Sequence, residues 1–174
     1  KGLLSLIVTL CCTFGFAQEF NYTVTDNNMT VQVDASICEN INEFVMENGD
    51  LLGAFFTNTD GELQNAGYSE FAGDQLAIAV WGTESGLANG FVSGEALTWM
   101  VFDSSEGTNV CLDAVMNNSP PFSDTYVGNG FGQVLALSSV ECGGGGDCVD
   151  NDDAMAPLDC ATAFTVFGCD GSRN

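Results

Sequence analysis

The sequence predicts an all-β protein, specifically an antiparallel β-sandwich of about seven or eight strands. Short apolar runs alternate with clusters of Gly, Asn, Asp and Ser at intervals of roughly 8 to 12 residues. Charged residues make up only 15% of the 174 residues, so Asn, Ser, Thr, Gln and Gly must supply most of the surface. Because helices usually carry Lys, Glu and Arg on their exposed faces, this composition favours strands.

The first expected element is a β-hairpin formed by residues 20–24 and 29–33. Apolar and polar side chains alternate along both runs, and Asp26 and Asn27 suit a two-residue turn between them. In that register one face of the hairpin is apolar and the other is wet. The apolar face holds Phe20, Tyr22 and Val24 from the first run and Met29, Val31 and Val33 from the second.

Further strands are expected at residues 51–57, 62–68, 75–81, 97–101, 110–112 and 132–140. Residues 75–81 are apolar at successive positions, which predicts a central strand buried on both faces. Trp99 lies between Leu97 and Val101 on one strand face, so we expect its ring in the core. The Asp60-Gly61 pair predicts a turn, and the glycines of residues 82–94 predict a long loop.

The charge of the chain excludes several classes of function. Lys1 and Arg173 are the only basic residues, His is absent, and the formal net charge is −22. A nucleic-acid partner is not expected, because such proteins neutralise phosphates with Lys and Arg. Phosphate loops that need Lys, Schiff-base lysines and His-dependent catalytic triads are missing their essential side chain.

The N-terminal residues 1–17 have the pattern of a secretory signal peptide. Lys1 precedes a short apolar run, and the small residues Gly15 and Ala17 suit cleavage after Ala17. The run is too short for a comfortable transmembrane helix, so no membrane span is expected in the mature chain. We therefore expect a secreted or cell-surface protein.

The cysteines are expected to form disulfides, because the chain carries an export signal. Two of the eight cysteines lie in the signal peptide. The remaining six are disulfide candidates of undetermined connectivity: Cys38, Cys111, Cys142, Cys148, Cys160 and Cys169. Zinc is disfavoured, since there is no His and no pair of cysteines separated by two residues.

The composition divides the mature chain into three parts. Residues 18–140 form the β-sandwich module, residues 141–147 form a Gly-rich linker, and residues 148–174 form a short cysteine-rich fragment with one expected helix. Four acidic residues where the linker meets this last part are candidate calcium ligands: Asp147, Asp150, Asp152 and Asp153. They do not match the EF-hand pattern, and a solvated acidic rim is the alternative.

Several blocks of the β-module resemble an accessory module of secreted Bacteroidetes-type multidomain proteins that are exported by type IX secretion. The blocks include GDLLGAFFT at residues 49–57, AIAVWG at residues 77–82 and TWMVFD at residues 98–103. The resemblance covers roughly residues 40–140 and implies an extracellular β-rich domain without catalytic residues. Residues 148–174 are similar to the first half of an ShK-like cysteine-rich module, which implies that this part is truncated.

The expected function is a non-catalytic binding or spacer module of a larger secreted or cell-surface protein, serving adhesion or glycan binding, with a glycan or a cell-surface protein as its partner. Trp81, at the end of the run 75–81 and beside the loop 82–94, is the candidate ligand-binding residue, with a core position as its alternative. A small carboxylate-dependent glycoside hydrolase and a calcium-stabilised structural module are the alternative functions. No cofactor is expected apart from calcium.

Overall fold

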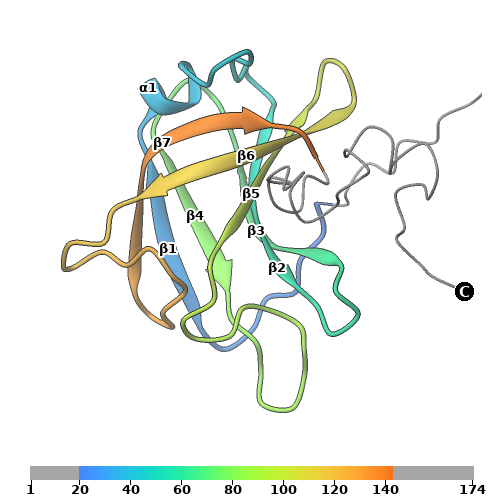
Figure 1. Cartoon of the computed structure of the whole chain (residues 1–174), viewed down its shortest axis with the longest axis vertical. Helices are drawn as coiled ribbons and strands as arrows, with labels where there is room; N and C mark the ends of the chain where they lie inside the picture. The colour runs from blue at the N-terminus through green and yellow to red at the C-terminus, as the bar shows by residue number, and fades with distance from the viewer. Residues whose placement is uncertain (1–19, 143–174) are drawn as a thin grey trace, which may run out of the picture. The chain divides into compact units, whose positions relative to one another are not determined.

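Seven strands and one short helix make up the part of the chain that the computed structural model describes, residues 20–142 (Figure 1). In chain order they are β1 (Asn28–Val33), α1 (Ala35–Cys38), β2 (Leu51–Thr57), β3 (Leu63–Glu70), β4 (Leu76–Trp81), β5 (Thr98–Asp103), β6 (Thr108–Met116) and β7 (Phe131–Val140). The all-β class predicted from the sequence is confirmed.

All seven strands belong to one hydrogen-bonded sheet, in the order β3-β2-β5-β6-β7-β1-β4. Every neighbouring pair is antiparallel except β1 and β7, which run parallel. The predicted sandwich has two sheets, and the parallel pair explains the difference. It joins the β1–β4 pair to the five other strands, which would otherwise form a separate sheet.

The two edge strands of this sheet, β3 and β4, lie against each other, so that the sheet curls almost into a closed barrel (Figure 1). The Ser69 hydroxyl of β3 donates a hydrogen bond to the Ala77 carbonyl oxygen of β4 at 3.1 Å. A Cβ atom on Gly67 would lie 2.0 Å from the Ala79 carbonyl oxygen, so only glycine permits this approach. Each edge strand therefore covers the other.

The core lies inside the curled sheet and receives side chains from every strand. β1 and β4 alternate buried and more exposed positions, as a strand with one face on the core should. Trp99 is buried in this cluster, which confirms its predicted core position. The largest fully buried side chains are Trp99, Tyr126, Phe55, Phe91, Met29, Leu52 and Ile78.

A smaller apolar cluster lies on the outer face of β2, β5 and β6 and consists of Phe55, Met100 and Cys111. Phe20 packs against it, with ring centroids 5.2 Å from Phe55 in an edge-to-face arrangement. A Cβ atom on Gly53 would lie 2.8 Å from the Phe20 ring, so this glycine makes room for the contact. The residues before β1 thus run along the outside of the sheet.

The predicted hairpin between residues 20–24 and 29–33 is therefore wrong in its first half. Residues 20–25 form no strand, and Val24 is 64% exposed. Both edges of β1 are already hydrogen-bonded, one to β4 and the other to β7. The alternating pattern is satisfied instead by packing on the outer face, where Phe20 and Tyr22 each contact Tyr68.

The predicted central position of residues 75–81 is also wrong. β4 is an edge strand, and its burial alternates, with Ala77 and Ala79 exposed. Alanine counts as apolar in a pattern, but its small side chain tolerates water and allows β3 to approach. An apolar run rich in Ala therefore does not require two buried faces.

One carboxylate lies inside the fold without a cationic partner. Asp50 is 2% exposed, and its oxygens accept hydrogen bonds from the Glu47 N–H at 2.8 Å, the Ser104 N–H at 2.9 Å and the Ser104 hydroxyl at 3.1 Å. No Lys, Arg or His occurs among residues 20–142, so N–H and O–H groups alone compensate its burial. These bonds tie the turn before β2 to the turn after β5.

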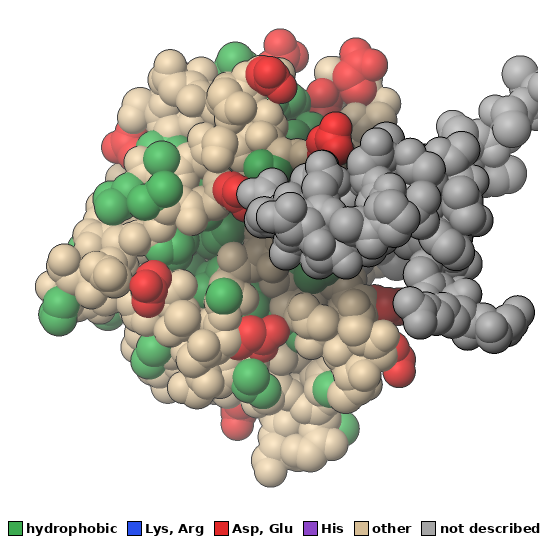
Figure 2. All heavy atoms as spheres, in the orientation of Figure 1, with side chains coloured by type: hydrophobic (Ala, Val, Ile, Leu, Met, Phe, Trp, Pro, Cys, Tyr) green, Lys and Arg blue, Asp and Glu red, His purple; other side chains and the backbone are tan. Residues whose placement is uncertain are grey.

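The other acidic side chains lie mostly on the surface and are dispersed rather than gathered in one patch on the face that Figure 2 shows. No group of three or more His, Cys, Asp or Glu within residues 20–142 is arranged to hold a metal ion. The described part of the chain thus spreads its negative charge over the surface, where salt can screen it.

Candidate functional site

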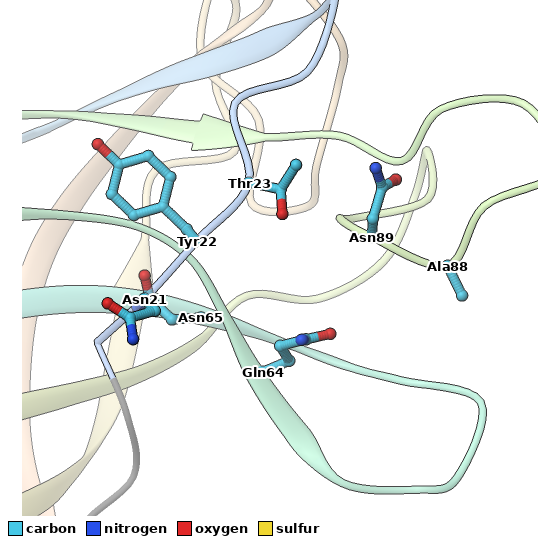
Figure 3. A pocket seen from close by; sticks show the side chains of 7 residues that line it. All are labelled: Asn21, Tyr22, Thr23, Gln64, Asn65, Ala88 and Asn89. Atoms are coloured by element: carbon cyan, nitrogen blue, oxygen red, sulfur yellow. The ribbon is translucent and has the colours of Figure 1, made fainter.

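A polar pocket among the described residues, which we call the amide pocket, lies between the segment before β1, strand β3 and the loop that joins β4 to β5 (Figure 3). Its volume is about 300 Å³, at the lower end of the range for small-molecule sites. The lining residues carry no charge: Asn21, Tyr22, Thr23, Gln64, Asn65, Ala88 and Asn89. Four of these seven side chains are carboxamides and two carry hydroxyl groups.

Asn65 forms a fixed part of this pocket, because it is 2% exposed and bound on both sides. Its Oδ1 accepts a hydrogen bond from the Gly67 N–H at 3.1 Å, and its Nδ2 donates to the Ala54 carbonyl oxygen at 3.4 Å. These bonds span the irregular register between β2 and β3 at Ala54 and Phe55. The bulge in this pair therefore holds the amide in place.

The loop wall of the amide pocket is held by its own hydrogen bonds. Asn89 Oδ1 accepts from the Glu84 N–H at 3.0 Å, and Asn89 Nδ2 donates to Glu84 Oε2 at 2.9 Å. At the base of the loop the Phe91 N–H donates to the Trp81 carbonyl oxygen at 3.1 Å. The Thr83 N–H donates in return to the Phe91 carbonyl oxygen at 2.8 Å. Such a wall is largely formed before any ligand arrives.

Tyr22 and Gln64 supply the more accessible groups of this pocket. Tyr22 is 41% exposed, and its ring meets Tyr68 edge to face at 5.5 Å between centroids. Gln64 is exposed, and in Figure 3 its amide extends toward the space in front of Ala88 and Asn89. The ring of Tyr22 and the exposed side-chain amide of Gln64 are therefore accessible to a ligand.

A second pocket, which we call the apolar pocket, adjoins the first and has a volume of about 260 Å³. It shares Ala88 with the amide pocket. Its other lining residues are Phe56, Thr57, Asn58, Thr59, Thr83, Leu87, Gly90, Val92 and Glu95. Glu95 is the single carboxyl side chain that lines either pocket.

The Glu95 carboxylate is positioned by backbone donors. One oxygen accepts from the Thr57 N–H at 3.2 Å and the other from the Val92 N–H at 3.0 Å. Each carboxylate oxygen has two lone pairs, so both retain capacity for a further donor. The Tyr126 N–H donates to the Glu95 carbonyl oxygen at 2.8 Å, and the Gly94 N–H donates to the Tyr126 carbonyl oxygen at 2.8 Å, which fixes the backbone at this residue.

Trp81, the ligand-binding residue predicted from the sequence, lines neither of these pockets. Its side chain is partly buried, and its Nε1 is buried with no hydrogen-bond partner among the residues that the structure describes. Its role in binding stays a prediction. The candidate calcium ligands Asp147, Asp150, Asp152 and Asp153 lie outside the described residues.

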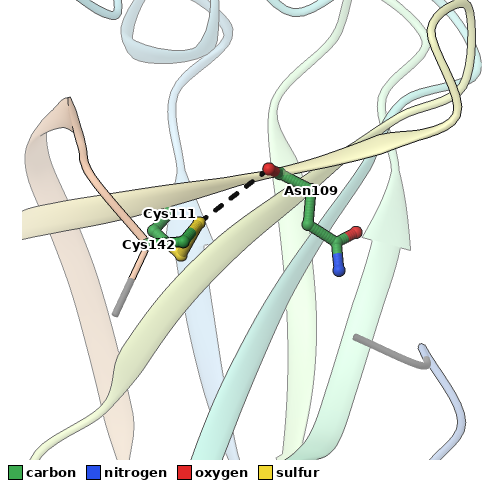
Figure 4. Close-up of a disulfide and its surroundings, with 3 residues drawn as sticks. All are labelled: Asn109, Cys111 and Cys142. Carbon is green, nitrogen blue, oxygen red and sulfur yellow. Dashed lines mark hydrogen bonds between the residues drawn. A yellow bond between two sulfur atoms is a disulfide. The ribbon is translucent and has the colours of Figure 1, made fainter. Parts of the chain in front are cut away.

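Of the candidate disulfides, the structure contains a bond between Cys111 of β6 and Cys142 just after β7 (Figure 4). The Cys142 sulfur also lies 3.9 Å from the Asn109 carbonyl oxygen, a contact without a proton to share because both sulfurs are bonded. Cys38 is a free thiol in the core, where burial, followed by the charge of Asp34, raises its pKa to about 11. The candidates Cys148, Cys160 and Cys169 fall outside the described residues.

No sequence pattern predicts the amide pocket, because its residues come from three separate segments. Asn21, Tyr22 and Thr23 fall in the predicted hairpin, and Gln64 and Asn65 fall in the strand expected at residues 62–68. Asn89 was one polar residue in a loop rich in them. Uncharged polar residues are common at strand ends, so no local signal marks these six as a group.

Comparison of the chain with protein-family models, with curated proteins and with solved structures gives no match. Among residues 20–142, no helix has the length and apolar character needed to cross a membrane.

Proposed function

We propose that this domain is a non-catalytic binding module for neutral glycans, acting within a secreted or cell-surface protein. The amide pocket is the observation that carries the proposal. Carboxamides both donate and accept hydrogen bonds, and sugar hydroxyls do the same, so a cluster of amides suits vicinal hydroxyl groups. The partly exposed ring of Tyr22 offers an apolar face for the C–H side of a pyranose.

Charge favours a neutral ligand over an ionic one. No charged side chain lines the amide pocket, so an ionic group would lose its hydration without a compensating partner. The net charge of −22 further repels anionic polymers such as nucleic acids and sulfated glycans. A neutral oligosaccharide avoids both penalties.

A binding role is supported over hydrolysis by the single carboxyl group in the two pockets. Glycoside hydrolases use a pair of carboxyl groups about 5 to 10 Å apart across the scissile bond. Glu95 lines the apolar pocket without a second carboxyl group beside it in the lining of either pocket. A secreted location is supported by the predicted signal peptide and by the Cys111–Cys142 disulfide, since such bonds persist in oxidising compartments.

The proposal is tested by isothermal titration calorimetry of the purified chain with a panel of neutral oligosaccharides. Gln64→Ala removes an exposed amide of the pocket, and we expect binding to weaken about 10-fold, equivalent to the loss of about one hydrogen bond. Gln75→Ala, at an exposed position just before β4, is the matched control and should bind as the parent chain does. Heat release that is the same in Gln64→Ala and the parent chain for every ligand contradicts the assigned site.

A further inference from the structure

The amide pocket and the apolar pocket are joined at two points. Ala88, exposed on the loop between β4 and β5, lines both of them. Two of their lining residues are also neighbours, because Phe56 of the apolar pocket and Gln64 of the amide pocket are directly opposite in the β2–β3 pair. Opposite residues in an antiparallel pair have Cβ atoms about 5 Å apart. The two pockets therefore form one strip along the end of the β2–β3 hairpin, with volumes of about 300 and 260 Å³ side by side.

The two halves of this strip differ in chemistry. The apolar pocket presents the exposed side chains of Leu87 and Val92, which are 57% and 54% exposed, over the buried ring of Phe56. Beside them lies the Glu95 carboxylate, which accepts backbone N–H groups and has lone pairs to spare. A ligand group that fits here carries a small apolar part next to a hydrogen-bond donor.

An acetamido group meets this requirement within a neutral sugar. Its methyl group gains from contact with Leu87 and Val92, and its N–H is a donor for the Glu95 carboxylate. A plain hexose offers only hydroxyl groups at the same position, and contact with these polar groups gives Leu87 and Val92 no apolar surface to pack against. An anionic substituent in place of the acetamido group is repelled by Glu95.

On the basis of the proposed glycan-binding function, we propose that the joined pockets bind a neutral oligosaccharide of at least two units. The amide pocket takes one neutral pyranose unit, with or without an acetamido group, and the apolar pocket takes an N-acetylhexosamine. Chain length and N-acetylation then determine affinity, with Leu87, Val92 and Glu95 as the specificity-determining residues.

The experiment is calorimetric titration of the full chain with three probes: N-acetylglucosamine, its β-1,4-linked dimer, and the β-1,4-linked glucose dimer. We expect the N-acetylated dimer to bind about 10-fold more tightly than either of the other two probes. Leu87→Ser should lower the affinity for the N-acetylated dimer to that for the glucose dimer and leave the glucose dimer unaffected. Gln64→Ala should weaken both dimers.

The control for Leu87→Ser is Val115→Ser, because Val115 of β6 is 59% exposed and lies in neither pocket. The acetamido assignment is overturned, while glycan binding stands, if the two dimers bind with equal affinity. It is also overturned if Leu87→Ser leaves the affinity for the N-acetylated dimer unchanged. Equal binding of the N-acetylated monomer and dimer overturns the joined strip. If none of these probes and no glycan of the wider panel binds, the proposed function itself is refuted and the acetamido assignment with it.

Discussion

Asp50 gives the sharpest test of how this fold is held together, because it is a buried carboxylate in a domain without a single cationic side chain. Replacement by Ala leaves the backbone N–H groups of Glu47 and Ser104 without their acceptor. An unmatched donor costs about 1 to 3 kcal/mol, so we expect Asp50→Ala to lower the free energy of unfolding by about 3 kcal/mol. Asp50→Asn keeps one oxygen but turns an amide N–H₂ toward one of the donors, and we expect a loss of about 1.5 kcal/mol.

The measurement is urea denaturation followed by Trp fluorescence, with the free energy obtained by linear extrapolation. Asp113→Asn is the matched control, because Asp113 is exposed and its replacement removes the same charge. The control should be neutral or slightly stabilising, since it reduces repulsion among the acidic groups. If Asp50→Asn has the same denaturation midpoint as Asp113→Asn, the hydrogen bonds of Asp50 do not stabilise the two turns and the reasoning fails.

Four further predictions concern stability. Replacing Cys111 and Cys142 together by Ser should cost about 3.5 kcal/mol, because the disulfide closes a loop with a sequence separation of 31; an unchanged urea midpoint contradicts this. The raised pKa of Cys38 means that the folded thiol keeps its proton while the unfolded thiol ionises. This contribution to the free energy of unfolding is complete below about pH 9, and up to about 2.7 kcal/mol of it is lost as the pH rises toward 11. Cys38→Ala should therefore flatten the profile of urea midpoint against pH between these values. Gly67→Ala should cost about 2 to 3 kcal/mol and speed amide exchange in β3 and β4, because the added Cβ collides with the Ala79 carbonyl oxygen; native exchange rates would refute this contact. The melting temperature should rise between low salt and about 0.5 M NaCl, because salt screens repulsion among 24 acidic residues that only two basic residues oppose; a fall contradicts this.

The sequence was sufficient to predict the strands whose local pattern and turn residues agree. The run at residues 51–57 coincides with β2, and the run at residues 132–140 differs from β7 by one residue. Trp99 was placed correctly in the core, because its neighbours on the same strand face are apolar. In these cases alternation, turn chemistry and burial all lead to the same assignment.

Pairing between distant segments could not be predicted in the same way. The alternation in residues 20–24 fits a strand next to β1, but β4 and β7 occupy both of its edges. The parallel pairing of β1 with β7 joins the first strand to the last, and no turn specifies it. The contact between β3 and β4 depends on Gly67, a residue whose local pattern gives no hint of the Ala79 carbonyl opposite it.

The same limit applies to the candidate site. An aromatic residue beside a glycine-rich loop drew attention to Trp81, whereas the pocket beside that loop is lined by amides from three segments. Asn65 and Asn89 are held by hydrogen bonds that only the folded chain creates. Their place in the pocket wall follows from the folded backbone around them, which a linear pattern does not contain.

The position of the disulfide also determines how this domain would carry mechanical tension. β7 ends at Val140, two residues before Cys142, and Cys142 is bonded to Cys111 in β6. A pull on the chain beyond Cys142 therefore passes through the sulfur bridge into β6, and it does not peel β7 away residue by residue. The residues between the two cysteines, which include the second half of β6 and all of β7, are shielded from this load, so tension from that end enters the sheet through the β6 residues at and before Cys111.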